Sequence, residues 1–125
     1  MAVAERLAAA DPSNAGWQRD LSVSHNKIGD VLRAQGDLAG ALKAYRESLA
    51  VAERLAAADP SNAGWQRDLF VIYWRMADMA EKSGQGNARD WWRKAYNQLS
   101  NMKSRGIILP TQEQYLAALK SKVGE

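Results

Sequence analysis

The chain has 125 residues, of which 46% are hydrophobic and 25% charged, a balance typical of globular domains and not of disordered or membrane-embedded chains. It contains no cysteine, which excludes disulfides and thiolate metal sites. The formal net charge of +3 is too small to indicate a nucleic-acid partner, and the charges of Glu5 and Arg6 interrupt the apolar run that a signal peptide needs. We therefore expect a soluble, cytoplasmic protein that neither crosses a membrane nor binds nucleic acid.

A long internal repeat dominates the sequence. Ala2–Leu21 reads AVAERLAAADPSNAGWQRDL, and Ala50–Leu69 repeats those letters without a change, 48 residues later. Self-similarity with a period of about 20–50 residues is typical of stacked repeat architectures. Identity over so long a segment indicates either recent duplication or deliberate construction, and both explanations remain open.

The first period predicts two helices joined by a glycine turn. Asp-Pro-Ser-Asn at 11–14 breaks the chain, and its Ser or Asn can cap the helix that follows. Gly36 ends that helix, and Asp37 can cap the next, which runs to a second Asp-Pro-Ser-Asn turn at 59–62. Steps of three and four between apolar positions predict a buried stripe on each helix. The first stripe is Trp17, Leu21, Ser24, Ile28, Val31 and Leu32, and the second is Leu38, Ala41, Leu42, Tyr45, Leu49, Ala52 and Leu55.

The second period keeps this plan and adds one helix. Gly84 is expected to end its first helix, and Asn87 to cap its second. Gly106 ends that helix, and a capping box of Thr111 and Gln114 predicts a last helix at about residues 110–123. The expected stripes are Trp65, Leu69, Ile72, Met76 and Met79, then Ala88, Trp91, Trp92, Ala95, Tyr96, Leu99 and Met102, and finally Tyr115, Leu119 and Val123.

The segment 28–38, followed by Ala41, Tyr45, Leu49 and Asp59-Pro60, resembles the tetratricopeptide repeat. That family has a period of about 34 residues, so the period of 48 looks like its long-helix bacterial variety. The resemblance implies an all-α fold of tandem antiparallel helix hairpins, stacked as a right-handed α-solenoid with a C-terminal capping helix. We expect one domain over residues 1–125, comprising the end of a truncated repeat helix (1–10), two helix pairs (14–58 and 62–105) and the capping helix (110–123).

The second pair departs from the first at several positions. Ala77 stands where the first pair has Gly29, and Phe70-Val-Ile-Tyr-Trp replaces Ser-Val-Ser-His-Asn. Two alignments of the second helices are open, one matching Trp92 with Tyr45 and the other matching Tyr96 with Tyr45. We prefer the first, because it needs only one residue lost from a turn.

The resemblance implies that the first helix of each pair lines a concave groove. By that carry-over, the chain is a non-catalytic scaffold that binds a peptide or protein partner and needs no cofactor. The positions that would face the groove are Asn26, Asp30 and Arg33 in the first pair and Trp74, Asp78 and Glu81 in the second. Three of these are acidic, and Asp30 and Asp78 in particular argue against the carboxylate clamp of the co-chaperone members.

A self-assembling structural module is the alternative function. The repeat expected at 1–10 is incomplete, so either the chain is a fragment of a longer array or a second copy covers the open helix face. We expect the second arrangement, a homo-oligomer. The aromatic residues between Phe70 and Tyr96 are open to two interpretations, as protein core or as ligand surface. An exposed Trp74 favours partner binding, whereas a Trp74 buried under the last helix favours self-assembly.

No residue pattern indicates catalysis or metal binding. His25 is the only histidine, and it occupies a position where the family has a large residue packed between helices. No further residues stand at metal-ligand spacing from it. Gly84-Gln85-Gly86 lacks the strand, the third glycine and the lysine of a phosphate loop. We therefore expect neither an enzyme nor a metal or cofactor site.

Overall fold

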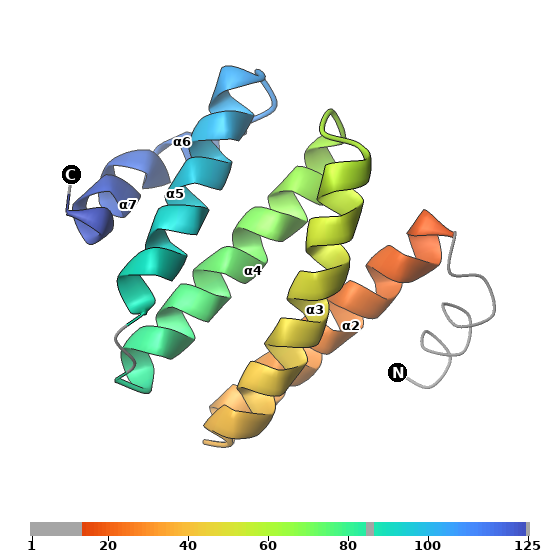
Figure 1. The fold of residues 1–125 in the computed structure, drawn as a ribbon, viewed down its shortest axis with the longest axis vertical. Coiled ribbons are helices and arrows are strands. Elements are labelled where there is room, and N and C mark those ends of the chain that lie inside the picture. The colour runs from red at the N-terminus through yellow and green to blue at the C-terminus, as the bar shows by residue number, and fades with distance from the viewer. Residues whose placement is uncertain (1–13, 85–86, 125) are drawn as a thin grey trace. The chain divides into compact units, whose positions relative to one another are not determined.

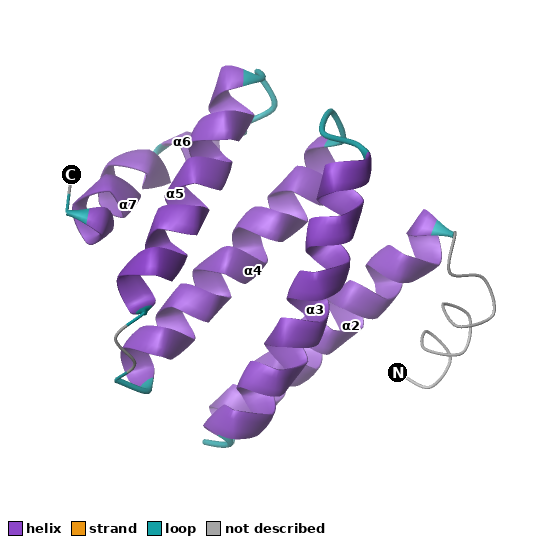
Figure 2. Cartoon of the chain, in the orientation of Figure 1, coloured by secondary structure: helices purple, strands orange, loops and turns teal. Residues whose placement is uncertain are grey.

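The computed structural model describes residues 14–84 and 87–124, and every regular element in those ranges is a helix (Figures 1 and 2). In chain order the elements are α2 (Ala15–Ala34), α3 (Leu38–Ala58), α4 (Ala63–Lys82), α5 (Ala88–Ser104), α6 (Pro110–Glu113) and α7 (Tyr115–Val123). The expected all-α class is therefore confirmed for the described residues. The helix end expected at 1–10 lies outside them.

Internal contacts divide the chain into two compact units, residues 1–58 and 59–125. In the described part of the first unit, α2 and α3 pack against each other. In the second unit, α5 packs against both α4 and α7. In each of the two expected helix pairs, two long helices therefore pack against each other.

The helix starts use asparagine caps of matching geometry. The side chain of Asn14 accepts a 3.0 Å hydrogen bond from the backbone N–H of Trp17, and Asn62 accepts the same bond from Trp65. Asp37 is the next cap, since its Oδ1 accepts from the N–H of Gly40 at 2.9 Å. These bonds satisfy N–H groups that a helix start leaves without a partner.

One expected cap makes no capping bond, and another is predicted at the wrong residue. Asn87 precedes α5 with φ −95° and ψ 9°, and its side chain makes no capping bond. Thr111 lies inside α6, which starts at Pro110 after Leu109, and the backbone N–H of Leu109 donates to Oε1 of Gln112 at 3.1 Å. The last helix, expected as one element at 110–123, is divided at Gln114 into α6 and α7.

Small and polar residues form much of the interface between α2 and α3. A Cβ at Gly29 would overlap the ring of Tyr45, so glycine is what lets this ring lie against the α2 backbone. The hydroxyl of Ser22 donates to the backbone carbonyl of Ser48 at 3.0 Å, and both side chains are buried. The buried face of α2 is therefore rotated relative to the stripe expected from the sequence. Val31, which the spacing places on that stripe, is 55% exposed.

Among the described residues, the second unit has the larger set of buried apolar side chains. Its expected stripe on α4 is buried at Leu69, Ile72, Met76 and Met79. A cluster joins α4, α5 and α7 through Phe70, Ala77, Trp92, Ala95, Leu99, Met102 and Leu119. Phe70 holds the sequence position that Ser22 holds in the first pair, so a polar contact between helices is replaced by an aromatic one. The buried Trp92 and half-buried Tyr96 favour the alignment of Trp92 with Tyr45, which is also fully buried.

A search of the described residues for a membrane-crossing helix found none with sufficient length and apolarity.

Candidate functional site: an aromatic cleft on the second helix pair

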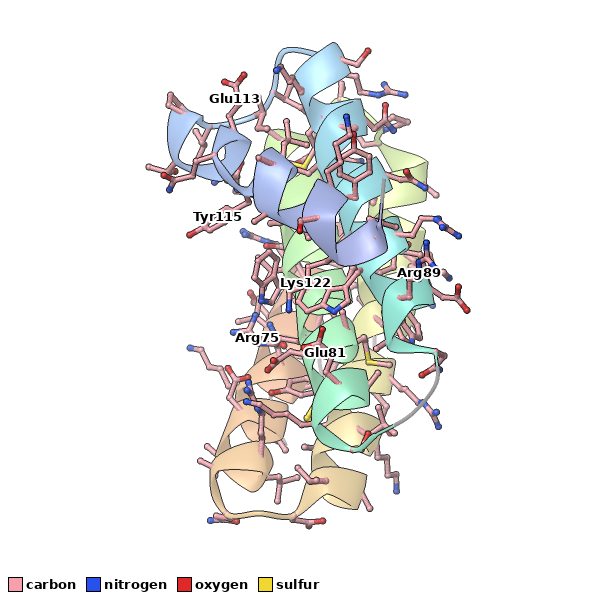
Figure 3. The ribbon with its side chains drawn as sticks, turned by 90° about the vertical axis from the view of Figure 1, so that its left-hand side faces the viewer. Arg75, Glu81, Arg89, Glu113, Tyr115 and Lys122 are labelled. Atoms are coloured by element: carbon pink, nitrogen blue, oxygen red, sulfur yellow. The ribbon has the colours of Figure 1, made fainter. Side chains whose placement is uncertain are left out.

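A cleft of about 300 Å³ opens on the second unit between α4 and α7. Five residues line it: Phe70, Val71, Trp74 and Arg75 from α4, and Tyr115 from α7. The α4 residues come from the segment 70–75, in which positions one turn apart share a face. In Figure 3, Tyr115 and Arg75 project on the same side of α4. The cleft therefore combines aromatic walls with a guanidinium group.

Trp74 is at the centre of the aromatic contacts. Its ring lies 6.0 Å from Phe70, 4.9 Å from Trp92 and 5.5 Å from Tyr115, measured between centroids, and all three pairs meet edge to face. Such pairs stabilise one another beyond the area they bury. The indole is only half-buried, so these contacts hold it in place and leave part of it accessible in the cleft.

Glu81 lies beyond the cleft, farther along α4, and is held by two donors. The indole N–H of Trp92 donates to its Oε1 at 2.6 Å, and Nζ of Lys122 donates to the same oxygen at 3.1 Å. Desolvation acts to raise the pKa of Glu81, but the hydrogen bonds from Trp92 and Lys122 and the charge of Lys122 outweigh it. The net result is a pKa below the ordinary value of 4.5, so the carboxylate is ionised at neutral pH.

A second aromatic pair lies outside the cleft. The rings of Tyr73 and Trp91 are 6.4 Å apart, and Nζ of Lys94 lies 5.0 Å from the Trp91 centroid and 5.9 Å from that of Tyr73. This ammonium group already occupies the faces that a cationic ligand would use. The aromatic residues between Phe70 and Tyr96 are thus partly core, as at Trp92, and partly accessible surface, as at Trp74.

The expected groove residues of the first unit lie in three different environments. Asp30 accepts a hydrogen bond of 2.5 Å from the hydroxyl of Tyr45. Oδ1 of Asn26 is buried, and none of the described donors reaches it. Arg33 is half-buried near the end of α2. His25 points toward α3, with its Nδ1 3.1 Å from a carboxylate oxygen of Glu47, and its side chain is 14% exposed.

Two of the three expected residues of the second unit contact the same indole. Trp74 packs on the ring of Trp92, and Glu81 accepts a hydrogen bond from its N–H. Asp78 instead pairs with Lys82, four residues farther along α4, at 3.4 Å. Sequence reasoning missed Val71, Tyr115 and Lys122 as site residues. The aromatic stripe did contain Tyr115, but no pattern in the sequence placed it opposite Trp74.

No cluster of three or more side chains able to hold a metal ion occurs among the described residues. Comparison of the chain with protein-family models, with curated proteins and with solved structures gave no match.

Proposed function

We propose that the protein is a non-catalytic interaction scaffold that binds a peptide or protein partner. The observation that carries this proposal is the cleft in which Trp74, Phe70, Tyr115 and Arg75 meet. Aromatic and arginine side chains are the residues in which binding energy concentrates at interfaces. Because Trp74 is fixed by three rings, a partner side chain can enter the cleft without having to order its walls.

The chemistry of the cleft favours one kind of anchor. Three aromatic rings offer apolar faces, and the guanidinium group of Arg75 carries a positive charge at the edge. An apolar side chain with an acidic group nearby in the peptide complements both features. A peptide anchored in this way places its apolar group against Trp74 and its carboxylate toward Arg75.

As part of the proposal, the two helix pairs are repeats of the tetratricopeptide type, stacked as a right-handed solenoid. Supporting observations come from inside each pair. Ala41 and Tyr45 are fully buried, and the ring of Tyr45 lies against Gly29, at the positions where the resemblance requires small and aromatic residues. The turn residue Gly36 has a φ of 83°, a conformation that favours glycine.

Self-assembly is the second candidate function, and one observation favours it. Val23 and Val31 of α2 are 37% and 55% exposed, although each is a large apolar residue within a helix. Two copies of the chain that cover these residues would form a homo-oligomer. Light scattering over a concentration series distinguishes the two functions, since a mass of 13.8 kDa throughout excludes stable self-assembly.

The proposal is tested by selecting peptides from a random library displayed on phage. The wild-type chain is the bait, and a Trp74→Ala variant with unchanged helix content is the counter-selection bait. We expect enrichment of peptides with an aromatic or aliphatic anchor beside an acidic residue, and their loss on the variant. A selection that enriches nothing, or that enriches the same peptides on both baits, would contradict binding at the cleft.

A further inference from the structure

The C-terminal helix α7 contacts the second unit through Tyr115, Leu116, Leu119, Lys122 and Val123. Among its residues only Leu119 and Val123 are fully buried, four positions apart on one face. Leu119 joins the cluster of Trp92, Leu99 and Met102, and α7 lies beside α5 (Figure 1). At the end of α7, Nε of Arg89 donates to the backbone carbonyl of Val123 at 2.8 Å.

Lys122 of α7, which lies between Leu119 and Val123 in the sequence, contacts both Glu81 and Trp92. Nζ of Lys122 lies 3.1 Å from Oε1 and 3.4 Å from Oε2 of Glu81, and 4.8 Å from the centroid of the Trp92 ring. A carboxylate beside an aromatic face is the combination that recognises an ammonium group. The indole N–H of Trp92 also donates a hydrogen bond to this carboxylate and so orients it toward the ammonium group.

The attachment of α7 is weak by physical criteria. Nine residues are too few for a helix to be stable alone, and Gln114 gives its start no side-chain cap. The ion pair adds only a modest stabilisation, because the Lys122 and Glu81 side chains are 44% and 40% exposed. We therefore expect α7 to open before the longer α4 and α5, which pack on each other, separate.

Opening of α7 would uncover a surface with defined chemistry. Its apolar part is the side of Trp92, Leu99 and Met102 that Leu119 covers, and its charged part is Glu81. An amphipathic helix docks on such a surface through residues spaced three or four apart. The structure itself shows one occupant that satisfies both parts, with leucine, lysine and valine at positions 119, 122 and 123.

We propose that this surface is a recognition site for a lysine-bearing amphipathic helix of a partner protein, and that α7 occupies it within the chain. The partner helix carries two aliphatic residues four positions apart, with a lysine immediately before the second. It competes with α7 for Leu99, Met102, Trp92 and Glu81. The proposal differs from peptide binding at the Trp74 cleft in its ligand, because it depends on an ammonium group that pairs with a carboxylate, and no carboxylate lines the cleft.

The test uses a labelled peptide with the sequence of residues 107–124 and measures its binding by fluorescence anisotropy. The labelled peptide is titrated with the wild-type chain and with a Leu119→Asp variant, in which α7 lacks the leucine that it buries in the second unit. Because one buried leucine is lost from the competing helix, we expect the variant to bind the peptide at least about tenfold more tightly. Equal affinity for both chains, with the helix content of the variant intact, would overturn the proposal.

Peptide variants test the lysine. With the Leu119→Asp chain as the binding partner, we expect Lys122→Glu in the peptide to weaken binding about fivefold, and Lys120→Glu, at an exposed position, to leave it unchanged. If the Lys122→Glu and Lys120→Glu peptides bind equally well, or if a scrambled peptide binds as well as they do, the binding is nonspecific and hydrophobic. Either result would refute recognition of the ammonium group. If the Leu119→Asp chain loses helix, the Lys122→Glu chain replaces it as the binding partner of the labelled peptide. We expect this chain to bind the peptide about threefold more tightly than wild type does, and the same outcomes would refute the proposal.

Discussion

The hydroxyl of Tyr45 donates a hydrogen bond of 2.5 Å to Oδ1 of Asp30, and the ring that carries it lies against Gly29. One side chain of α3 is thus fixed on α2 by both packing and a polar contact. In the second unit the aromatic residue at the aligned position is Trp92, and its indole N–H donates to Glu81. Ala77 replaces the glycine there, and the acceptor is one helical turn farther along than the counterpart of Asp30.

The glycine under Tyr45 is expected to be essential for the first helix pair. A methyl group at Gly29 would overlap the ring, so Gly29→Ala should lower the free energy of unfolding by about 1–3 kcal/mol. The matched control is Gly64→Ala in the first turn of α4, where the nearest atom would be 3.4 Å from the new methyl group. That change should be neutral or stabilise by up to about 1 kcal/mol. Urea unfolding followed by circular dichroism measures both, and equal effects would contradict the packing of Tyr45 on Gly29.

The asparagine caps should differ in their contribution to stability. Asn62→Ala removes the acceptor for the N–H of Trp65 and should cost about 1 kcal/mol of unfolding free energy. Asn87→Ala removes no capping bond, since the Asn87 side chain makes none, and should change stability by less than about 0.5 kcal/mol. Thermal melts of the two variants provide the comparison. A larger loss at Asn87 than at Asn62 would show that the cap geometry is wrong.

The docking of α7 should weaken in acid. The pKa of Glu81 is lower in the folded chain than its ordinary value of 4.5, so the ionised carboxylate stabilises the fold at neutral pH. This contribution is fully present above the ordinary pKa and is lost as the pH falls through the lowered one. Glu81→Gln should therefore lower the melting temperature at pH 7 and have a smaller effect at pH 3.

The control for this pH series is Asp20→Asn, a change at an exposed carboxylate of α2. It should alter the melting temperature little at either pH. If Glu81→Gln lowers the melting temperature equally at pH 3 and pH 7, the charge of Glu81 does not hold α7, and the contact with Lys122 contributes nothing.

Local chemistry made much of the fold predictable. The Asp-Pro-Ser-Asn turn at 59–62 and the glycine at 36 determine where helices start and stop, because their effects act within a few residues. The stripe on α2 was less predictable, since the fully buried residues of this helix are Gln18, Ser22 and Gly29. Helices that approach closely need small residues at their contact, and a count of apolar positions does not detect those.

The candidate site could be predicted only in part. Trp74 and Glu81 were expected to belong to a site, because the repeat period aligns them with Asn26 and Arg33. Tyr115 and Lys122 could not be placed beside them, since the docking of α7 on α5 joins segments distant in the sequence. Such contacts depend on the turn at 105–109 and on the burial of Leu119, which together determine which face of α7 meets α4.

The most direct measurement for the central claim is the dissociation constant of a selected peptide for three forms of the chain. Isothermal titration calorimetry would compare wild type, Trp74→Ala and Trp91→Ala, the last being a half-buried tryptophan outside the cleft. The scaffold account expects Trp74→Ala to weaken binding at least about tenfold and Trp91→Ala to leave it within about twofold. Unchanged affinity in the Trp74→Ala variant would contradict it.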